Sequence, residues 1–519
     1  MRPPSSLAVI AAVLAWTGPA AAEEPDVSAL YKGHCAECHG ADRLGGSGPA
    51  LLKENLGRLR PAQAEQVIAS GRPSTQMPGF KDTLASEQIA ALSRFVFSPA
   101  PVPEWTGERM AASRISHTST DALPTKPTHK ADPLNLFTVV ETGDHHVTIL
   151  DGDTFTPLWR FPSRYALHGG AKYSPNGRFV YLGSRDGWVS MYDLWSLAPV
   201  AEIRAGINTR NIAVSGDGRY VMVGNTLPPS LVILDAKSLT PVKVIPVLGD
   251  KGLASRVSAV YAAPPRDSFV VALKDIPEIW EISYLDNPKP VALGFVHSHQ
   301  PGMIEGAFDA GPFPVGRIKL DDYLDDFFFD QSYANLIGAA RNGRNGQVVN
   351  MNVGRKIADV ELAGLPHLGS GITFEYQGRP VLATPHLKEG AVSVIDMTTW
   401  KRVKKIETLG PGFFMRSHEN TPYAWVDVFF GPDKDAVHVI DKRTLEIVRT
   451  LRPVPGKTAA HVEFTRDGRY ALLSIWEPDG GLIVYDAATL QEVKRIPMKK
   501  PSGKYNVFNK ITRSAGTSH

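Results

Sequence analysis

Short apolar runs separated by turn residues dominate the chain from Phe137 onward. The runs are rich in β-branched and aromatic residues and lack the long periodicity of a helix, so they predict β-strands. A polar residue follows one run in each repeat, at Asp151, Asp193, Asp235, close to Glu281, close to Asn352, and at Asp396, Asp441 and Asp486. All intervals but one are about 42–46 residues, the length of a four-stranded blade. The pattern predicts an all-β, eight-bladed β-propeller over residues 134–519.

Three nearly identical segments, 174–179, 215–220 and 465–470, support the repeat. Each contains Asn-Gly or Asp-Gly, which supplies the positive φ angles that a tight hairpin needs. The one long interval, between Glu281 and Asn352, predicts an insertion of about two dozen residues over 301–330. It would hold the acidic and aromatic run 321–330, whose phenylalanines suggest that it packs over another part of the protein.

The pattern before Phe137 predicts three further segments. Residues 1–22 combine Arg2, an apolar run and small residues before Glu23, which is typical of a secretory signal peptide. Residues 23–98 are expected to form a small all-α domain that ends in a helix over 86–97. Ser86 would cap this helix, and Ile89, Leu92 and Val96 would form its apolar face. Residues 99–133 are polar and dotted with prolines, and are expected to be a linker.

Composition restricts the classes of function. A chain of 519 residues is too long for one ordinary domain, and a hydrophobic content of 43% is that of a globular protein. The formal net charge of +3 gives no reason to expect nucleic acid or an anionic membrane as a partner. No stretch after the signal segment is apolar for long enough to span a bilayer. We expect the mature protein in the periplasm.

The only two cysteines, Cys35 and Cys38, are followed directly by His39. This is the attachment sequence of a c-type haem, in which both thiols bind the macrocycle and the imidazole binds the iron. A disulfide with this spacing would close a tight, redox-active ring and would not stabilise the fold well. A zinc site would need a second Cys/His pair nearby. Met77, in a Met-Pro-Gly loop, is the expected second axial ligand. Residues 23–98 are therefore predicted to be a cytochrome c domain with one covalent haem c.

Two sets of residues are candidates for a site at the propeller axis. The histidines are His168, His367, His386, His418 and His461. Taken singly, each such histidine is more often a hydrogen-bonded structural residue than a ligand. The cations are Arg185, Arg210, Arg256 and Lys274. Arginine forks bind carboxylates well, so these cations suit a ligand with several carboxyl groups, and salt bridges between blades are the alternative.

Several stretches resemble the cytochrome cd1 family of denitrifying bacteria, in which a cytochrome c domain precedes an eight-bladed propeller. They are Tyr165-Ala-Leu-His168, Ser174-Pro-Asn-Gly-Arg-Phe-Val-Tyr181, Arg185-Asp-Gly187, Asp193-Leu-Trp195, Gly224-Asn-Thr-Leu-Pro-Pro229 and Ser502-Gly-Lys-Tyr-Asn-Val-Phe-Asn509. The resemblance implies that His168 is the proximal iron ligand of a non-covalent haem d1. It also implies that the four cations lie near the carboxylates of that macrocycle.

Three departures favour one branch of the family. The nitrite reductases carry two distal histidines over the d1 iron; His367 matches one, whereas the other aligns with the acidic run around Asp325. His461 stands where the reductases lack a histidine, and Tyr505 where they usually have phenylalanine. With these differences and the ending 510–519, the chain resembles the branch of dihydro-haem d1 dehydrogenases.

For that branch, the resemblance implies that a propionate side chain of dihydro-haem d1 is oxidised to an acrylate, the last step of haem d1 biosynthesis. His461, with a reference pKa of about 6.5, is the better base, and Tyr505, with one of about 10, would orient the carboxylate or relay a proton. His168 and His367 would ligate the iron of the substrate. Electrons would pass to haem c, between His39 and Met77, and on to a periplasmic acceptor such as a small c-type cytochrome.

Two other functions stay open. The first is a nitrite reductase that works with one distal histidine, keeps haem d1 as its cofactor and forms nitric oxide. The second is a non-catalytic carrier that transfers haem d1 to nitrite reductase, which would then be a partner. A carrier would not need a base at His461, and a reductase would be expected to have a second distal histidine.

Overall fold

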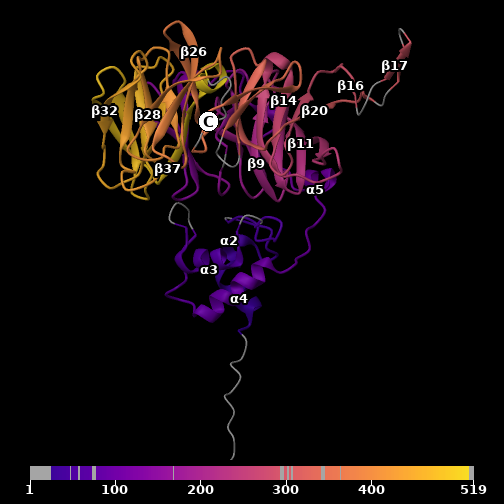
Figure 1. Cartoon of the computed structure of the whole chain (residues 1–519). Helices are drawn as coiled ribbons and strands as arrows, with labels where there is room; N and C mark the ends of the chain where they lie inside the picture. The colour runs from indigo at the N-terminus through magenta and orange to yellow at the C-terminus, as the bar shows by residue number, and fades with distance from the viewer. Residues whose placement is uncertain are drawn as a thin grey trace, which may run out of the picture.

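The computed structural model describes residues 25–46, 48–56, 59–72, 77–167, 169–292, 297–300, 303–305, 308–340, 345–362 and 364–513. A helical domain lies against one face of a ring of β-sheets, and a thin hairpin extends from the side of the ring (Figure 1). Among these residues, no helix has both the length and the apolar character needed to cross a membrane.

The helices of the N-terminal domain surround a small apolar core. They are α1 (Val27–His34), α2 (Ala36–His39), α3 (Pro61–Ser70) and α4 (Ser86–Phe97). The predicted helix over 86–97 is confirmed, and Ile89, Leu92 and Val96 are buried with Tyr31. Its cap was predicted one residue too late. Ala85 is the N-cap, and its backbone N–H donates to Gln88 Oε1 (2.9 Å), because Ser86 already belongs to the first turn.

Residues 99–133 form an ordered strap along one blade of the ring, the blade that contains Glu202. Its elements are α5 (Gly107–Ala112), β1 (Ile115–Ser116) and the short 3-10 helix η1 (Thr120–Ala122). β1 pairs antiparallel with the outermost strand of that blade, Ile115 opposite Glu202. Trp105 and Met110 are buried in a cluster that includes residues of the blade. The segment therefore does more than connect the domains, since it is itself packed on the propeller.

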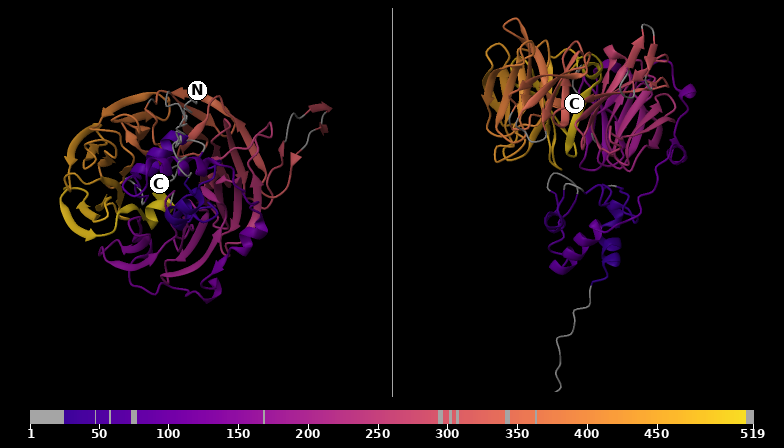
Figure 2. Two further views of the ribbon diagram at one scale, coloured as in Figure 1. Left: turned by 90° about the horizontal axis from the view of Figure 1, so that it is seen from below. Right: turned by 45° about the vertical axis from the view of Figure 1, so that its right-hand side comes forward.

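The ring consists of eight antiparallel sheets in the described part of the chain, each with four strands, one of which gains β1 as a fifth (Figure 2). The first strands of neighbouring sheets contact one another, so they line the axis. From the axis outward, the first four sheets are β5 (Lys172–Tyr173), β6 (Phe179–Gly183), β7 (Trp188–Asp193), β8 (Ala198–Arg204); β9 (Asn208–Val214), β10 (Tyr220–Leu227), β11 (Pro229–Asp235), β12 (Pro241–Pro246); β13 (Val257–Ala263), β14 (Ser268–Leu273), β15 (Glu278–Ser283), β20 (Val315–Lys319); and β21 (Leu324–Phe329), β22 (Asn335–Ala340), β23 (Gly346–Asn350), β24 (Arg355–Val360).

The last sheet closes the ring. The remaining sheets are β25 (Ile372–Tyr376), β26 (Arg379–Pro385), β27 (Ala391–Asp396), β28 (Arg402–Glu407); β29 (Met415–Ser417), β30 (Tyr423–Asp427), β31 (Val437–Asp441), β32 (Glu446–Leu451); β33 (Ala459–Phe464), β34 (Tyr470–Ile475), β35 (Gly481–Asp486), β36 (Glu492–Pro497); and β37 (Pro501–Asn506), β2 (Leu136–Glu141), β3 (His146–Asp151), β4 (Pro157–Pro162). β37 comes from the end of the chain and pairs with β2 from its beginning, Val139 opposite Lys504. Closure removes exposed sheet edges and places the last strand at the axis.

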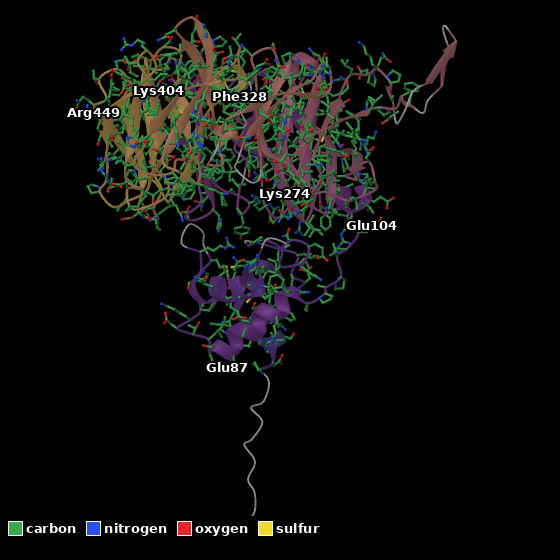
Figure 3. The ribbon with its side chains drawn as sticks, viewed as in Figure 1. Glu87, Glu104, Lys274, Phe328, Lys404 and Arg449 are labelled. Carbon is green, nitrogen blue, oxygen red and sulfur yellow. The ribbon has the colours of Figure 1, made fainter. Side chains whose placement is uncertain are left out.

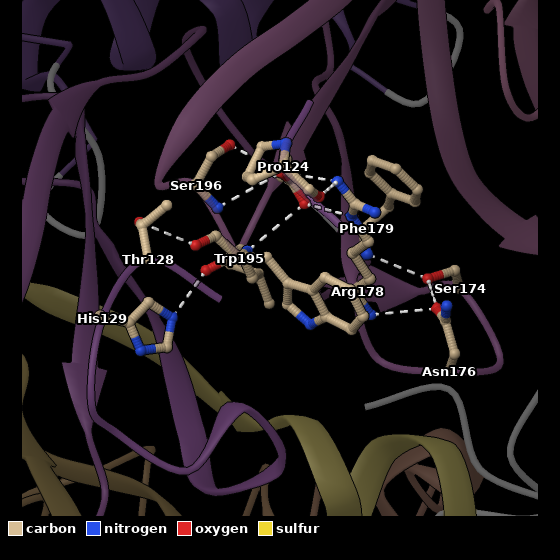
Figure 4. Close-up of polar contacts among 11 residues, drawn as sticks. Pro124, Thr128, His129, Ser174, Asn176, Arg178, Phe179, Trp195 and Ser196 are labelled. Carbon is tan, nitrogen blue, oxygen red and sulfur yellow. Dashed lines mark hydrogen bonds and ion pairs between the residues drawn. The ribbon is translucent and has the colours of Figure 1, made fainter. Parts of the chain in front are cut away.

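The predicted repeat is confirmed, because the polar residue that recurs in each repeat, from Asp151 to Asp486, lies at or near the end of the third strand of a sheet. Asp193 is one of these residues, and Figure 4 shows the turn with which it interacts. Asn176 Oδ1 accepts hydrogen bonds from the Ser174 hydroxyl (2.7 Å) and from Arg178 N (3.1 Å), which shapes the first turn. Arg178 Nε then donates to Asp193 Oδ1 (2.8 Å). The carboxylate at the end of the third strand thus holds the turn between the first and second strands.

The predicted position of the insertion, 301–330, is wrong. The insertion connects β15 with β20 over residues 284–314, and its described strands are β16 (Val291–Ala292), β17 (His297–Gln300), β18 (Met303–Glu305) and β19 (Phe308–Asp309). These strands form the hairpin at the right of Figure 1. The run 321–330 instead contains β21, whose Phe327, Phe328 and Phe329 are at most 2% exposed. The aromatic residues are blade core, not part of a loop.

Candidate functional site

The cysteine motif lies where α1 meets α2. Cys35 joins the two helices, Cys38 lies in α2, and both thiols are free. His39 Nδ1 is 2.7 Å from the carbonyl oxygen of Pro49. A proton donated to that carbonyl leaves the Nε2 lone pair for a metal. A Cβ at Gly48 would come within 2.6 Å of the His39 ring, so the loop fits closely around the imidazole. These features fit a covalent haem c.

The loop that carries Met77 is held through its backbone. Met77 packs beside the apolar core of the helical domain, and its carbonyl accepts a hydrogen bond from Arg72 N (3.1 Å). Gly71 has φ +69°, and a Cβ there would come within 2.6 Å of Met77 O. The glycine therefore allows the close approach of the loop. Met77 stays the predicted second iron ligand.

The helical domain covers the face where loops lead into the innermost strands. Arg204 Nη2 donates to Leu44 O (2.7 Å), and Asn208 Nδ2 donates to Asn55 Oδ1 (2.8 Å). Lys274 lies at the same face (Figure 3). Residues on this face of the propeller are therefore close to the domain that is predicted to hold haem c.

The four predicted cations come from three neighbouring blades and have different partners. Burial, and next the charge of Arg210, lower the pKa of Arg185 to about 9. Arg210 Nε donates to Ser258 O (2.7 Å). Arg256 forms a bidentate pair with Asp275, Nε–Oδ2 2.9 Å and Nη2–Oδ1 2.7 Å. The salt-bridge alternative thus holds for Arg256, whereas the adjacent charges of Arg185 and Arg210 favour an anionic ligand.

Lys274 and the acidic run meet at β21. Lys274 Nζ is 3.9 Å from Asp325 Oδ1. The next residue, Asp326, accepts hydrogen bonds from Gly369 N (2.6 Å) and from the Tyr261 hydroxyl. The acidic run is therefore packed against η4 (Leu368–Ser370), the short 3-10 helix that directly follows His367.

His367 is held at one ring nitrogen. Nδ1 lies 2.6 Å from Phe413 O and 2.9 Å from Ser370 Oγ. Burial lowers the pKa of His367, and the carboxylate of Asp326 opposes this shift. A neutral imidazole with Nδ1 bound to a carbonyl can offer Nε2 to iron. The carboxylate near His367 is that of Asp326, in the acidic run 321–330.

His461 lies in a β-bulge of an innermost strand. Its φ is +54°, and the pairing of β33 with β34 shifts register between Ala460 and Val462. Its N–H donates to Asp427 Oδ2 (3.2 Å), and its carbonyl accepts a hydrogen bond from Lys504 Nζ. Bulges commonly re-aim a side chain. The ring meets that of Tyr505 edge-on, with 5.2 Å between centroids.

The electrostatics of this pair suit proton transfer. Burial, and next the cations Lys504, Arg416 and Lys510, hold the pKa of His461 well below its usual value, so the ring is neutral. His461 Nε2 is buried and has no hydrogen-bond partner among the described residues. Burial raises the pKa of Tyr505 to about 12, so its hydroxyl stays protonated and can donate.

The sequence reasoning missed four cations around this pair: Lys172, Arg416, Lys504 and Lys510. Arg416 and Lys504 are 7% and 0% exposed, and burial lowers the pKa values of all four. Carboxylates nearby include that of Glu463, 3.9 Å from Arg416 Nε, and that of Asp427. The sequence signal that could have identified them is the presence of charged residues within strands that are mostly buried. An excess of buried cations fits a ligand with several carboxylates.

The other predicted histidines separate into two groups. His168 lies outside the described residues, although Gly170 packs so closely on Tyr505 that a Cβ would come within 3.0 Å of its ring. His386 Nε2 is 2.9 Å from Ser393 Oγ, and His418 Nε2 is 3.2 Å from Arg466 O. These two contacts are those of structural histidines.

Comparison with known families defines the class of the protein. Residues 131–301 and 303–510 match the family described as "Cytochrome D1 heme domain", and residues 22–96 match "Cytochrome C oxidase, cbb3-type, subunit III". The chain belongs to the cytochrome d1 haem-domain family, and it carries a cytochrome c domain in front of the propeller. The predicted fold class and the two haem cofactors are thereby confirmed.

Individual relatives narrow the class. The "Dihydro-heme d1 dehydrogenase" of Pseudomonas aeruginosa is 55% identical over 515 residues, 99% of each chain. A solved structure, "Dihydro-heme d1 dehydrogenase NirN in complex with DHE", is 56% identical with a TM-score of 0.82, covering 93% of this chain and 99% of that chain. The nitrite reductase of Stutzerimonas stutzeri is 27% identical over 94% of this chain and 93% of its own. The resemblance to the dehydrogenase branch is confirmed, and the protein is an oxidoreductase.

Proposed function

We propose that the protein is a periplasmic dehydrogenase that oxidises a propionate side chain of dihydro-haem d1 to the acrylate. The observation that carries this proposal is the buried pair of His461, whose Nε2 has no partner among the described residues, and Tyr505, whose hydroxyl stays protonated. A base and a donor beside a set of buried cations suit a carboxylate side chain that must lose a proton. The similarity to a dihydro-haem d1 dehydrogenase over the whole chain supports the same activity.

Different residues of the chain have different roles in the proposed reaction. Arg185, Arg210 and Arg416 neutralise the carboxylates of the macrocycle, and Tyr505 donates to the carboxylate of the reacting side chain. His461 Nε2 accepts a proton from the saturated carbon next to it. Two hydrogens leave the side chain in all: His461 takes up one proton, solvent takes up the other, and an external acceptor finally receives the two electrons.

Iron ligands and haem c complete the site. His367, with His168, holds the iron of the substrate and keeps the side chain in register. Cys35, Cys38 and His39 would hold haem c, which would supply a one-electron acceptor between the macrocycle and an external acceptor.

The alternatives make different demands on the site. A nitrite reductase of this family would be expected to have a second distal histidine, and here Asp326 lies beside His367. A carrier would need no base. A buried histidine without a partner at Nε2 would then cost free energy of folding and serve no function. Both observations favour the dehydrogenase.

Location and partners follow from the same proposal. The signal-like pattern of residues 1–22 and a covalent haem both favour the periplasm. The electron acceptor would be a small periplasmic c-type cytochrome. Nitrite reductase would receive the finished haem d1.

The test is anaerobic incubation of the purified holoprotein with dihydro-haem d1. With a one-electron oxidant supplied, we expect the macrocycle to lose two mass units while haem c is reduced and reoxidised, since one haem c holds only one of the two electrons. His461→Gln should bind the macrocycle and convert it at least about 100-fold more slowly. Binding without a mass change, with an oxidant present, would contradict the proposal. A nitrite assay on the loaded protein would then distinguish a reductase from a carrier.

A further inference from the structure

Lys504 contacts His461 on the side of the ring opposite Nε2. Its Nζ donates to the His461 carbonyl and to Ser474 Oγ (2.9 Å), and it lies 3.4 Å from His461 Nδ1. Lys504 lies in β37, the strand that closes the ring, and its side chain is 0% exposed. A lysine so deeply buried needs a reason beyond packing, because burying its charge costs free energy.

The hydrogens around Nζ can be assigned from these contacts. A neutral amine has two hydrogens and one lone pair. If both hydrogens go to the His461 carbonyl and to Ser474, the lone pair faces Nδ1 and accepts its proton. The alternative is an ammonium that also donates to Nδ1, which would place the imidazole proton on Nε2. A buried N–H without an acceptor is rare and costly, and Nε2 has no partner among the described residues.

We propose that Lys504, as a neutral amine, is a positioning residue that holds His461 in its Nδ1-protonated tautomer, so that the Nε2 lone pair is free to take the proton of the substrate. This inference rests on the proposed function, in which His461 is the base. It deepens that function because it explains how a histidine without a carboxylate partner on its ring is kept in the reactive tautomer.

The surrounding charges agree with a neutral amine. Burial lowers the pKa of Lys504 to about 7; Glu463 and Asp427 oppose this shift, and Arg416 adds to it. Asp427, which holds the His461 backbone, is itself buried, and this raises its pKa to about 6. Burial, Arg416 and Lys510 also lower the pKa of His461, so the ring stays neutral even when Lys504 carries no charge. Near pH 8, Lys504 is therefore neutral and Asp427 is charged.

The first experiment measures the tautomer without any substrate. Ring-15N-histidine is incorporated into the holoprotein with haem c kept reduced, and the His461 signals are assigned by their loss in His461→Gln. We expect the Nδ1-protonated form at pH 8 in the wild type and a shift toward the Nε2-protonated form in Lys504→Met. An Nε2-protonated His461 in the wild type at pH 8 would overturn the proposal, whatever the activity of the protein.

The second experiment measures the rate of haem c reduction by dihydro-haem d1 in single turnover. The wild-type rate should rise with pH through about 7, because only the neutral amine accepts from Nδ1. Lys504→Arg, which can only donate, should react about 100-fold more slowly. It should bind the macrocycle at least as tightly as the wild type, since the arginine adds a positive charge that attracts the carboxylates of the ligand.

Lys442 offers a matched control. It is also partly buried and donates to a histidine carbonyl, His418 O (3.0 Å), outside the site. Lys442→Met should leave both the rate and its pH dependence unchanged. Equal rates for Lys504→Arg and the wild type would refute the role of Lys504. If the wild type oxidises no dihydro-haem d1, the proposed function fails, and the tautomer measurement still decides what Lys504 does.

Discussion

At the scale of single residues, the axis is unusual for the positive charge that it buries. Arg416 is 7% exposed, and its Nη2 has no hydrogen-bond partner among the described residues. A guanidinium in this state costs free energy in the free protein. The arrangement makes sense when an anion with several carboxylates fills the site, because the same charge then forms charge-assisted hydrogen bonds.

Replacement of Arg416 separates binding from stability. Arg416→Met removes one of several buried cations, and Glu463 keeps a hydrogen bond from Asn509 Nδ2 (3.2 Å), so we expect the free energy of unfolding of the free protein to stay about the same. The affinity for dihydro-haem d1 should fall about tenfold or more, as a spectroscopic titration would measure. Arg443→Met is the control, since Arg443 pairs with Asp441 on the surface of the same blade and should change neither quantity. Loss of stability with unchanged affinity would contradict this role.

Removal of one hydroxyl tests Tyr505. Tyr505→Phe keeps the ring contact with His461 and removes a hydroxyl that forms no hydrogen bond to a described residue. The melting temperature should therefore stay within about 2 °C. The rate of haem c reduction by dihydro-haem d1 should fall about 10–100-fold because the carboxylate loses its donor. An unchanged rate would assign the chemistry to His461 alone.

Some of these residues could be predicted from the sequence and others could not. His461 and Tyr505 were found because they depart from a family pattern, and the structure brings them together. Lys504 and Arg416 were missed because a charged residue in a strand is usually on the surface. Only the topology shows that β29 and β37 are innermost strands, where a side chain faces the axis.

At the scale of elements, the polar residue that ends each third strand was predictable because it has a structural task. Asp193 shows the task, since it binds the arginine of the preceding turn. The insertion was placed wrongly for an equally physical reason. The run around Phe328 is acidic and aromatic like a loop, but Asp325 and Asp326 contact residues of neighbouring elements, while the phenylalanines fill the core between blades.

The blade that contains β31 should be sensitive to acid. His438 Nε2 accepts a hydrogen bond from Leu409 N (3.2 Å), and Nδ1 contacts Thr450 Oγ1 (2.8 Å), so the folded blade requires a neutral ring. Burial, with Arg452, lowers the pKa of His438 to about 4. The unfolded chain binds this proton from about pH 6.5 downward, whereas the folded chain binds it only near pH 4. Stability should therefore fall as the pH drops through this window.

A variant isolates this contribution from those of other histidines. The loss attributable to His438 is at most about 3 kcal/mol in the free energy of unfolding. His438→Gln keeps an acceptor and cannot titrate, so its stability should depend less on pH between 6.5 and 4 than that of the wild type. Urea unfolding at both ends of the window measures the difference. Parallel curves for the two proteins would show that His438 does not titrate there.

At the scale of the whole molecule, the order of the domains could be predicted, but their contact could not. The sequence divides the chain by composition, and it shows neither where the strap packs nor which face the helical domain covers. In the structure, Leu44 and Leu52 of that domain share one buried cluster with Trp105 of the strap and Ile207 of the second blade. This docking fixes the haem c motif relative to the axis, so the proposed electron transfer would not need a search by a tethered domain.

Leu52 tests whether that cluster holds the domains together. Its side chain is 0% exposed, and truncation of such a leucine typically costs about 2–5 kcal/mol. In Leu52→Ala we expect the strap over residues 99–133 to be cleaved by added protease about tenfold faster or more, because local opening exposes it. Leu51→Ala is the matched control, since Leu51 packs on the core of the helical domain instead. It should leave strap cleavage within about twofold of the wild type. Equal cleavage of both variants would mean that polar contacts such as Arg204 with Leu44 O maintain the docking without the apolar cluster.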